Sequence, residues 1–438
     1  MSKKNRLRRA ATVFASFVLA GVAFWGGAGT VGAQVAVLQG GPQAAVNPKA
    51  ASVAATLDEV LKETSEIRGL AVLRPVRSGA QSRAEIERML LRRLEEGKTT
   101  EKMRAGELAA KKFGLLPADF QLRPFLVSLL TEQILGYYDP KTQHFYLADW
   151  IEVDGQRPVM AHELTHALQD QHFDLRRFEK WPDGDSDAEL AAHALVEGDA
   201  SLAMMLYVMR DFKRAAGMLR SASASSPQLD RAPRALRESL VFPYDKGLEW
   251  ATQIYRRGGW AAVSAAYREL PQSTEQILHV EKYLTREAPV KVELTDLSSA
   301  IGAGWRRIES DVNGEWGYYL VLDQFLKDDK RSRAAAAGWA GDRYALYEHA
   351  RSGATALAHV SVWDTEQDAQ EFFDAYVART ERRYSLAPAA ETNGRPDASR
   401  RTWRTTDGPV TVERQGARVV VFEGLPAQVN AAELSKKL

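Results

Sequence analysis

The stretch Pro158-Val-Met-Ala-His-Glu-Leu-Thr-His-Ala-Leu168 decides how the rest of this sequence is interpreted. Uncharged residues flank His162 and His166 on both sides, which favours a buried helix over residues 156–172. Residues four positions apart lie on one face of a helix, so the two imidazole rings can point at the same place. Glu163 follows the first histidine directly. Two such rings beside a carboxylate are typical of a zinc site that activates water.

Zinc that keeps a water molecule needs a third ligand from the protein. His172 lies ten residues after His162, where metzincin peptidases carry their third histidine. Those peptidases need glycine at the position of Gln169, because the helix must break there. In an unbroken helix, six residues at about 100° each turn His172 away from the face of His166. We therefore expect His172 to lie outside the metal site.

A second long helix, predicted over residues 187–219, offers other ligands. Glu189, His193 and Glu197 are spaced four apart and form one stripe on it. The segment Leu195-Val-Glu-Gly-Asp-Ala200 resembles the signature with which gluzincin peptidases supply a glutamate as third zinc ligand. This resemblance implies Glu197 as the ligand. The spacing of the stripe offers His193 as the reserve and Glu189 as a partner behind the ligands. A solvated acidic stripe is the alternative.

Further blocks of the chain resemble a group of exported bacterial gluzincin-like zinc metallopeptidases, with the likeness strongest over residues 130–285. They are Gly136-Tyr-Tyr-Asp-Pro-Lys-Thr142, His162 to Leu175, Leu195 to Ala200, Phe242-Pro-Tyr244, Gly258-Gly-Trp260 and Pro271 to His279. The resemblance implies one Zn²⁺ per chain, bound by His162, His166 and Glu197, with Glu163 taking the proton of the attacking water.

Two departures from well-understood gluzincins limit that resemblance. A Gly-Ala-Met-Glu-Asn block, which grips the amino terminus of a substrate, is absent, so aminopeptidase activity is not implied. Asp199 follows Glu197 by two positions instead of the usual three or four, so the orienting role of the family's carboxylate does not carry over to it.

A donor for the developing oxyanion is also expected, since loss of such a donor commonly costs about 10²–10³ in rate. His279 is the first candidate, with Glu275 four residues earlier to orient its ring. Tyr283 and Tyr244 are the alternatives.

Composition excludes several classes of protein. The chain of 438 residues has no cysteine, which excludes disulfides, thiolate metal sites and a cysteine nucleophile. Its net charge of +1 shows no basic excess, so we expect no nucleic-acid partner. Residues 1–33 hold basic residues followed by an apolar run and small residues up to Ala33. This pattern predicts a cleaved signal peptide and a periplasmic or secreted protein without stable membrane insertion; an uncleaved anchor is the alternative.

The remaining chain is predicted to be α+β and predominantly α, with a zincin-like catalytic domain and a small C-terminal α+β domain. Apolar periodicity predicts helices over 57–67, 83–96, 100–113, 315–326 and 365–384, a β-hairpin over 134–147, and ββαββ order after residue 338. The expected division is a signal peptide (1–33), a flexible leader (34–55), an N-terminal helical segment (56–130), a metallopeptidase domain (131–330) and a C-terminal domain (338–438).

These observations predict an exported zinc-dependent peptidase, an endopeptidase acting on peptide or protein substrates. A zincin scaffold that binds a cell-envelope partner without catalysis is one alternative, and a zinc hydrolase of another amide or ester is a second. The helical segment 56–130 is either a removable pro-region or part of the catalytic unit. The aromatic hairpin edge is a candidate for pairing with an extended peptide.

Overall fold

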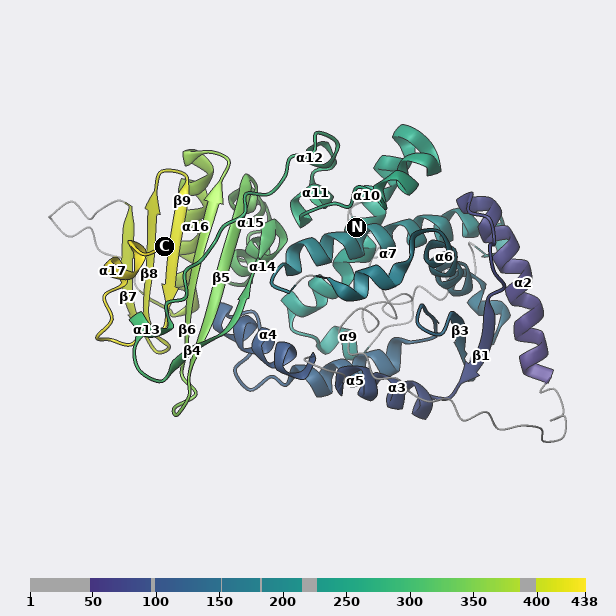
Figure 1. Ribbon diagram of the computed structural model, residues 1–438, viewed down its shortest axis with the longest axis horizontal. Helices are drawn as coiled ribbons and strands as arrows, with labels where there is room; N and C mark the ends of the chain where they lie inside the picture. The colour runs from purple at the N-terminus through teal and green to yellow at the C-terminus, as the bar shows by residue number, and fades with distance from the viewer. Residues whose placement is uncertain (1–47, 96–98, 151, 182, 215–226, 387–398) are drawn as a thin grey trace.

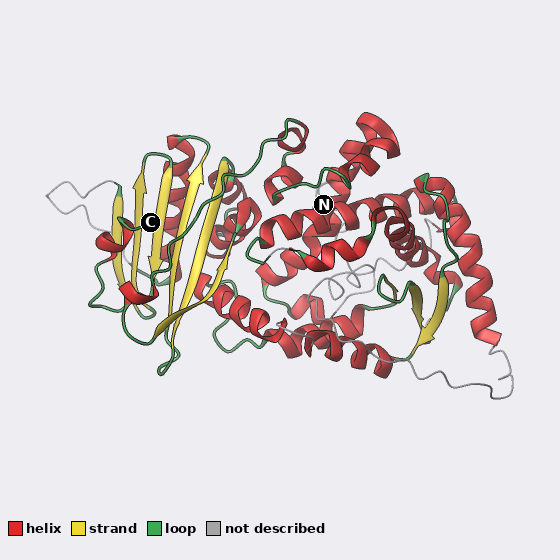
Figure 2. Cartoon of the chain, viewed as in Figure 1, coloured by secondary structure: helices red, strands yellow, loops and turns green. Residues whose placement is uncertain are grey.

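The computed structural model describes residues 48–95, 99–150, 152–181, 183–214, 227–386 and 399–438. The predicted signal peptide and most of the predicted leader lie outside these residues. The described chain is α+β: a mostly helical N-terminal part occupies one end, and an antiparallel six-stranded sheet occupies the other (Figures 1 and 2). Within the described residues, every helix is too short or too polar to cross a membrane.

The N-terminal segment folds into helices α2 (Pro48–Arg68), α3 (Arg83–Glu95), α4 (Thr99–Phe113) and α5 (Leu122–Gln133). The predicted helices over 57–67, 83–96 and 100–113 are therefore confirmed. Helix α2 begins at Pro48, inside the stretch predicted to be a flexible leader, because proline suits the first turn of a helix.

The predicted β-hairpin is confirmed as strands β2 (Gly136–Asp139) and β3 (His144–Ala148), which pair antiparallel. Strand β1 (Arg77–Gln81), which the sequence pattern did not predict, pairs in parallel with β3 and gives the sheet order β1-β3-β2. All four residues of β2 are buried. The expectation of an exposed edge on β2 is therefore wrong, because neighbouring elements cover that strand.

Helices α6 (Arg157–Phe173), α7 (Ser186–Met209) and α10 (Arg234–Ala266) form the centre of the helical part. Helix α6 is buried on all sides from Val159 to Asp170, which explains its lack of an amphipathic pattern. Helix α7 ends at Met209 instead of running to 219, and Asp211 accepts a hydrogen bond from the Lys213 backbone at the start of the next turn.

Helices α7 and α10 approach each other through two glycines. A Cβ atom added to Gly198 would lie 2.1 Å from the carbonyl oxygen of Gly247, and one added to Gly247 would lie 2.2 Å from that of Ala194. Helix α10 breaks at Gly258 and Gly259, the latter at a positive φ of 60°. After this break, Ser264 accepts a hydrogen bond from Arg68 of α2, and Tyr267 donates one to Asp199 of α7.

Short elements complete the helical part. They are 3₁₀ helices η2 (Asp154–Gln156) and η3 (Leu175–Lys180), and helices α9 (Pro227–Arg231), α11 (Thr274–Leu278) and α12 (Val280–Leu284). Helix α13 (Ser298–Ile301) lies against the C-terminal sheet, where Ile301 belongs to one apolar cluster with Tyr347 and Val420.

The C-terminal sheet has the order β4-β5-β6-β9-β8-β7, with all pairs antiparallel. Its strands are β4 (Trp305–Asp311), β5 (Trp339–His349), β6 (Thr355–Trp363), β7 (Arg400–Thr405), β8 (Gly408–Gln415) and β9 (Arg418–Glu423). Helices α14 (Gly314–Leu326), α15 (Asp329–Ala336) and α16 (Glu366–Arg383) pack beside it, and α17 (Ala431–Ser435) lies near the end.

Two features of this sheet differ from the predicted ββαββ order. The third strand of the predicted order is instead the hairpin β7–β8, because Gly408 takes a positive φ of 95° at the turn. Strand β4 comes before the predicted start of the C-terminal domain yet pairs with β5. Helix α4 also reaches the sheet: the Phe113 ring meets Tyr344 and His359 edge-on, with ring centroids 5.4 and 5.8 Å away.

Candidate metal centre

The two histidines of helix α6 lie side by side in the interior of the helical part. Their Nε2 atoms are 3.1 Å apart and their ring planes are almost perpendicular, at 86°. His162 is 1% exposed and His166 is 7% exposed. The four-residue spacing on an unbroken helix places both rings on one face, as the sequence predicts.

Glu197 of helix α7 completes this group from the neighbouring helix. Its Oε2 lies 3.1 Å from His162 Nε2 and 3.4 Å from His166 Nε2, and its side chain is buried. Helices α6 and α7 therefore bring the three predicted ligands together, and these three residues form a buried group that could hold a metal ion.

The distances among these three atoms fit a tetrahedral ion. Zinc–nitrogen and zinc–oxygen bonds of about 2.0–2.1 Å place tetrahedral ligands about 3.3–3.4 Å from each other. The observed separations are 3.1, 3.1 and 3.4 Å. Two imidazoles and one carboxylate are also a donor set that zinc accepts readily. The residues present fit a zinc ion.

Gln169, one turn after His166, fixes which nitrogen of His166 faces the group. The Gln169 amide nitrogen donates to the Val196 carbonyl oxygen and to Asp199 Oδ2, at 3.1 and 3.0 Å. Its Oε1 is thereby turned to His166 Nδ1, 2.8 Å away, and accepts a hydrogen bond from it. A proton on Nδ1 leaves the Nε2 lone pair free for a metal. Sequence reasoning treated Gln169 only as a missing glycine and missed this role.

The pKa values of the three side chains show how the group responds to a positive charge. Burial lowers the pKa of His162 to about 4. Burial alone would also lower the pKa of His166, but the Glu197 carboxylate outweighs it and raises that pKa to about 9. For Glu197, burial favours a higher pKa, and the neighbouring histidines lower it to about 2. This buried group therefore favours a cation at its centre.

Glu163 lies beside this group with its carboxylate held by the edge of the small sheet. The backbone N–H of Tyr138 in β2 donates to Glu163 Oε2 at 3.0 Å. Burial, reinforced by the charge of Glu197, raises the pKa of Glu163 to about 7. The Tyr138 hydrogen bond therefore positions the carboxylate through Oε2.

Other candidate ligands lie elsewhere. His172 points to the Ala71 carbonyl oxygen at 2.8 Å, outside the group, because α6 continues unbroken past Gln169. His193 is half-buried one turn before Glu197 and is not a member of the group. Glu189, expected behind the ligands, instead lies among the charges of Asp311, Lys102 and Asp183, so that expectation is wrong.

Two of the candidate oxyanion donors, His279 and Tyr283, are hydrogen-bonded to residues outside the metal-binding group. His279 Nε2 lies 2.9 Å from Glu315 Oε1, and this bond raises the pKa of the His279 ring. Its orienting partner is thus Glu315 and not Glu275, which pairs with Lys282 at 2.7 Å. Tyr283 donates to the Glu269 carbonyl oxygen.

Within the described part of the chain, Tyr244 is the candidate donor that contacts the histidine pair. Its ring centroid lies 6.2 Å from that of His162. Tyr244 is 3% exposed.

A second acidic group, Glu275, Glu287 and Asp364, also has the spacing of a cation site. The ammonium group of Lys282 sits among its three carboxylates, at 2.7, 2.6 and 2.8 Å. This lysine supplies the positive charge that a metal would bring, so the cluster is an ion-pair network.

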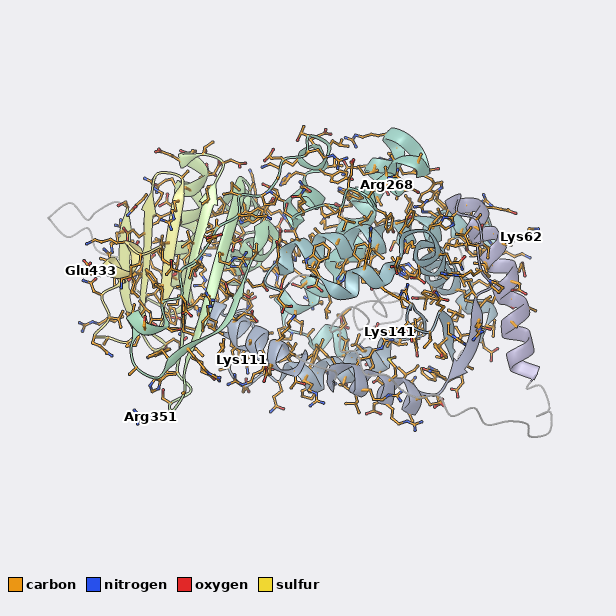
Figure 3. The ribbon with its side chains drawn as sticks, in the orientation of Figure 1. Lys62, Lys111, Lys141, Arg268, Arg351 and Glu433 are labelled. Atoms are coloured by element: carbon orange, nitrogen blue, oxygen red, sulfur yellow. The ribbon has the colours of Figure 1, made fainter. Side chains whose placement is uncertain are left out.

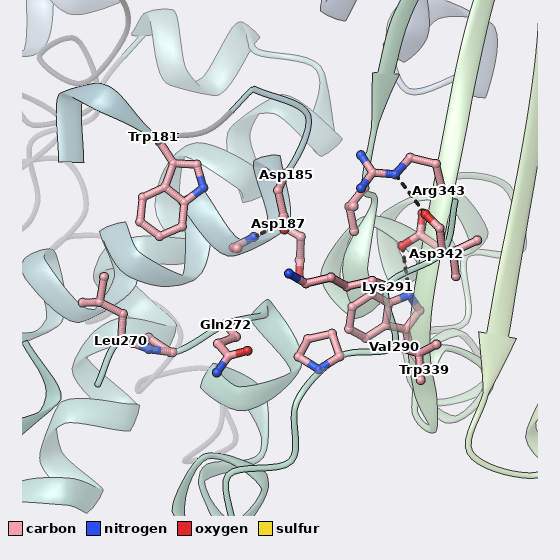
Figure 4. Close-up of a pocket in the computed structure, with 15 residues that line it drawn as sticks. Trp181, Asp185, Asp187, Leu270, Gln272, Val290, Lys291, Trp339, Asp342 and Arg343 are labelled. Atoms are coloured by element: carbon pink, nitrogen blue, oxygen red, sulfur yellow. Dashed lines mark hydrogen bonds between the residues drawn. The ribbon is translucent and has the colours of Figure 1, made fainter. Parts of the chain in front are cut away.

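A cavity of about 190 Å³ lies between the start of α7 and the C-terminal sheet (Figure 4). Trp181, Asp185, Lys291 and Arg343 contribute to its lining, together with apolar residues from both parts. None of the three metal-binding candidates lines it. This cavity is therefore separate from the metal centre.

Comparisons with known proteins cover parts of the chain. Residues 301–434, from the end of α13 to α17, match the domain of unknown function DUF8575. No curated protein matches. A solved structure from Chloroflexus aurantiacus, described as "a putative hydrolase with a novel fold", aligns with 64% of this chain and 97% of its own at 15% identity and a TM-score of 0.36. The metal centre lies outside the matched domain, so its function is inferred from its own geometry.

Proposed function

We propose that this protein is an exported zinc-dependent endopeptidase, in which His162, His166 and Glu197 hold the metal. The observation that carries the proposal is the convergence of three ligand atoms from two helices at tetrahedral spacing. The resemblance of the sequence to gluzincin-like metallopeptidases supports the choice of peptide substrates. The signal-peptide pattern of residues 1–33 supports export.

A bound zinc ion would supply a Lewis acid that polarises the scissile carbonyl and makes water a stronger nucleophile near neutral pH. The chain supplies the proton transfers. Glu163 accepts the proton that the attacking water loses and delivers it to the leaving amine. The Tyr138 N–H holds one oxygen of this carboxylate and leaves the other to exchange the proton. Gln169 keeps the His166 ring turned toward the metal position.

The test combines metal analysis with hydrolysis. Purified protein is expected to carry about one zinc per chain. The Glu163→Gln variant is expected to fold and keep its zinc while losing about 10²–10⁴ in the rate of casein cleavage, because general acid–base catalysis contributes that much. Glu189→Gln is the matched control, since this partly buried carboxylate lies away from the metal group.

Several outcomes would contradict the proposal. Equal casein cleavage by Glu163→Gln and the wild type would exclude the proposed proton transfer. A zinc-loaded protein that cleaves no member of a peptide library would indicate a binding protein on the same scaffold. Zinc-dependent cleavage of small amides or esters, with peptides left intact, would assign another class of substrate.

A further inference from the structure

The end of helix α2 lies directly behind the metal centre, on the side away from the ligand atoms. Arg68 is the last residue of α2, and its side chain is fully buried. Its guanidinium group grips both oxygens of Asp199, with Nε 2.5 Å from Oδ1 and Nη2 3.0 Å from Oδ2. The remaining nitrogen donates to Ser264, and the ring of Trp260 lies 4.5 Å from the guanidinium carbon.

Asp199 passes this contact on to the metal ligands. Its Oδ2 also accepts hydrogen bonds from Gln169 Nε2 at 3.0 Å and from the Tyr267 hydroxyl at 2.8 Å. Gln169 in turn accepts the hydrogen bond of His166 Nδ1. One continuous series of bonds therefore runs from Arg68 through Asp199 and Gln169 to His166, and we call it the Arg68 relay.

We propose that helix α2 is a permanent part of the metal centre and that Arg68, through this relay, is a positioning residue for His166. The inference rests on the proposed function of the site. It extends that function by assigning residues 48–81 to the catalytic unit, in place of a removable pro-region. Asp199 thereby gains an orienting role, exerted through Gln169 and not by direct contact with a ligand.

The packing of α2 supports a permanent role. Leu57, Val60, Leu61 and Ile67 are buried and belong to one apolar cluster with Met160, Leu164 and Leu168 of α6. After α2, strand β1 pairs in parallel with β3 over five residues, and the Gln81 side chain accepts a hydrogen bond from the Tyr137 hydroxyl. Loss of this segment would remove the packing partner of α6 and one strand of the small sheet, both of which support the site.

The side from which Arg68 approaches the metal ligands distinguishes it from a residue of an inhibitory segment. An inhibitory segment would act by covering the metal-facing side of the ligands. Arg68 reaches His166 through Nδ1, the nitrogen that faces away from His162 and Glu197. The relay therefore fixes the ring in the orientation that binding requires and leaves Nε2 unused.

The first experiment measures zinc affinity by competition with a chelator. Arg68→Met alone would leave the Asp199 charge buried without its partner and could unfold the protein. The double variant Arg68→Met with Asp199→Asn removes both charges. It is expected to fold, as judged by circular dichroism, and to bind zinc about 10–100-fold more weakly than the wild type, the usual effect of losing such partners.

Lys62→Met is the matched control, because Lys62 lies on the exposed face of the same helix (Figure 3). It is expected to keep wild-type zinc affinity. A folded double variant with wild-type affinity would overturn the relay. If the double variant does not fold, the zinc affinity of Gln169→Met, which removes no charge, is measured in its place. Wild-type zinc affinity in a folded Gln169→Met variant would also overturn the relay. A wild-type protein that binds no zinc would refute the proposed function itself.

The second experiment tests removal of the helix. A recognition sequence for a specific protease is inserted in the exposed loop 71–76 of the full chain, and the protein is cut. The α2 fragment is expected to stay bound through gel filtration, with zinc retained. Release of the fragment accompanied by full zinc content and increased peptide hydrolysis would show a pro-region and overturn the inference.

Discussion

The buried histidines of this protein have very different proton affinities, and their neighbours explain the difference. Burial disfavours a charged imidazole, and it lowers the pKa of His162 to about 4 and that of His359 to about 3. His166 is also buried, yet the adjacent Glu197 carboxylate raises its pKa to about 9. His162 is as close to that carboxylate, but the charge of His166 opposes a second proton there. In the metal-free protein, His166 is therefore the member of this pair that is expected to be charged near neutral pH.

His359 gives a testable pH dependence away from the metal centre. Burial lowers its pKa to about 3; the charge of Glu423 opposes this shift and that of Arg379 adds to it. An unfolded histidine titrates at about 6.5, so below that pH the unfolded chain binds more protons than the folded one. This group alone is expected to cost about 2–3 kcal/mol of stability between pH 7 and pH 4.5.

His359→Phe should remove that contribution. The imidazole packs among the rings of Phe113, Tyr318 and Tyr376, which suit another aromatic ring. Urea denaturation at several pH values checks the prediction. The variant should lose less stability on acidification than the wild type, and parallel curves for the two proteins would contradict it.

Glu197 and His172 give a paired test of the ligand assignment. Glu197→Gln removes the carboxylate that lies 3.1 Å from His162 and should weaken zinc binding by more than the about 10–100-fold typical of losing a partner of a ligand. His172→Ala removes a ring bound to the Ala71 carbonyl oxygen and should leave zinc content unchanged. Metal analysis after dialysis checks both; zinc loss only in His172→Ala would exclude the proposed ligand set.

Among the elements, the pair α7 and α10 sets how accurately Glu197 is placed. Gly198 directly follows Glu197, and the backbone of Gly247 occupies the space where its Cβ atom would lie. The two helices pack backbone to backbone at this point. The glycine in the segment resembling the gluzincin signature therefore has a packing reason here: a larger residue would move the helix that carries a ligand.

Gly198→Ala should destabilise the protein by at least about 1–3 kcal/mol, the usual cost of overpacking, and should also weaken zinc binding. Gly106→Ala is the matched control. Gly106 lies in helix α4 with no atom within 4 Å of an added Cβ, so alanine there should stabilise the helix by about 0.5–1 kcal/mol. Thermal denaturation with and without zinc checks both. Equal stability of the two variants would contradict the close packing of α7 and α10.

The elements also show what a sequence reveals and what it hides. The His162–His166 pair could be predicted from the sequence because both residues lie on one helix, where their spacing alone fixes their relative positions. The role of Arg68 could not be predicted, since its partner Asp199 lies 131 positions away and the packing of α2 on α7 brings the two residues together. Strand β1 was missed for a similar reason: Arg77-Ser-Gly-Ala-Gln81 has no alternating apolar pattern, and pairing with β3 creates the strand.

At the scale of the whole molecule, helix α4 joins the helical part to the sheet. Phe113 at its end is 2% exposed and packs against rings of β5 and β6. Arg379 of α16 donates to the Phe113 carbonyl oxygen and pairs with buried Glu423 of β9, 2.8 Å away. The C-terminal sheet therefore depends on a helix that precedes it by about two hundred residues, which no local pattern could predict.

We expect the two parts to unfold together. Phe113→Ala should lower the free energy of unfolding by about 3–5 kcal/mol, because it removes a buried ring at their junction. Calorimetry should show one transition in both proteins, and removal of zinc with a chelator should lower its midpoint as a whole. Two separate transitions in the wild type, only one of them sensitive to the chelator, would show independent domains.

The Arg68 relay also constrains the order of events during folding. Its first member, Arg68, is 131 positions from Asp199, and it also donates to Ser264, 196 positions away. Contacts over such distances form late, because closing long loops costs entropy before any bond is gained. The two imidazoles of α6 lie on one face as soon as that helix forms, whereas the orientation of the His166 ring is fixed only once the chain as far as Tyr267 has assembled. Tight metal capture is therefore a late step, which follows completion of the helical part and does not nucleate it.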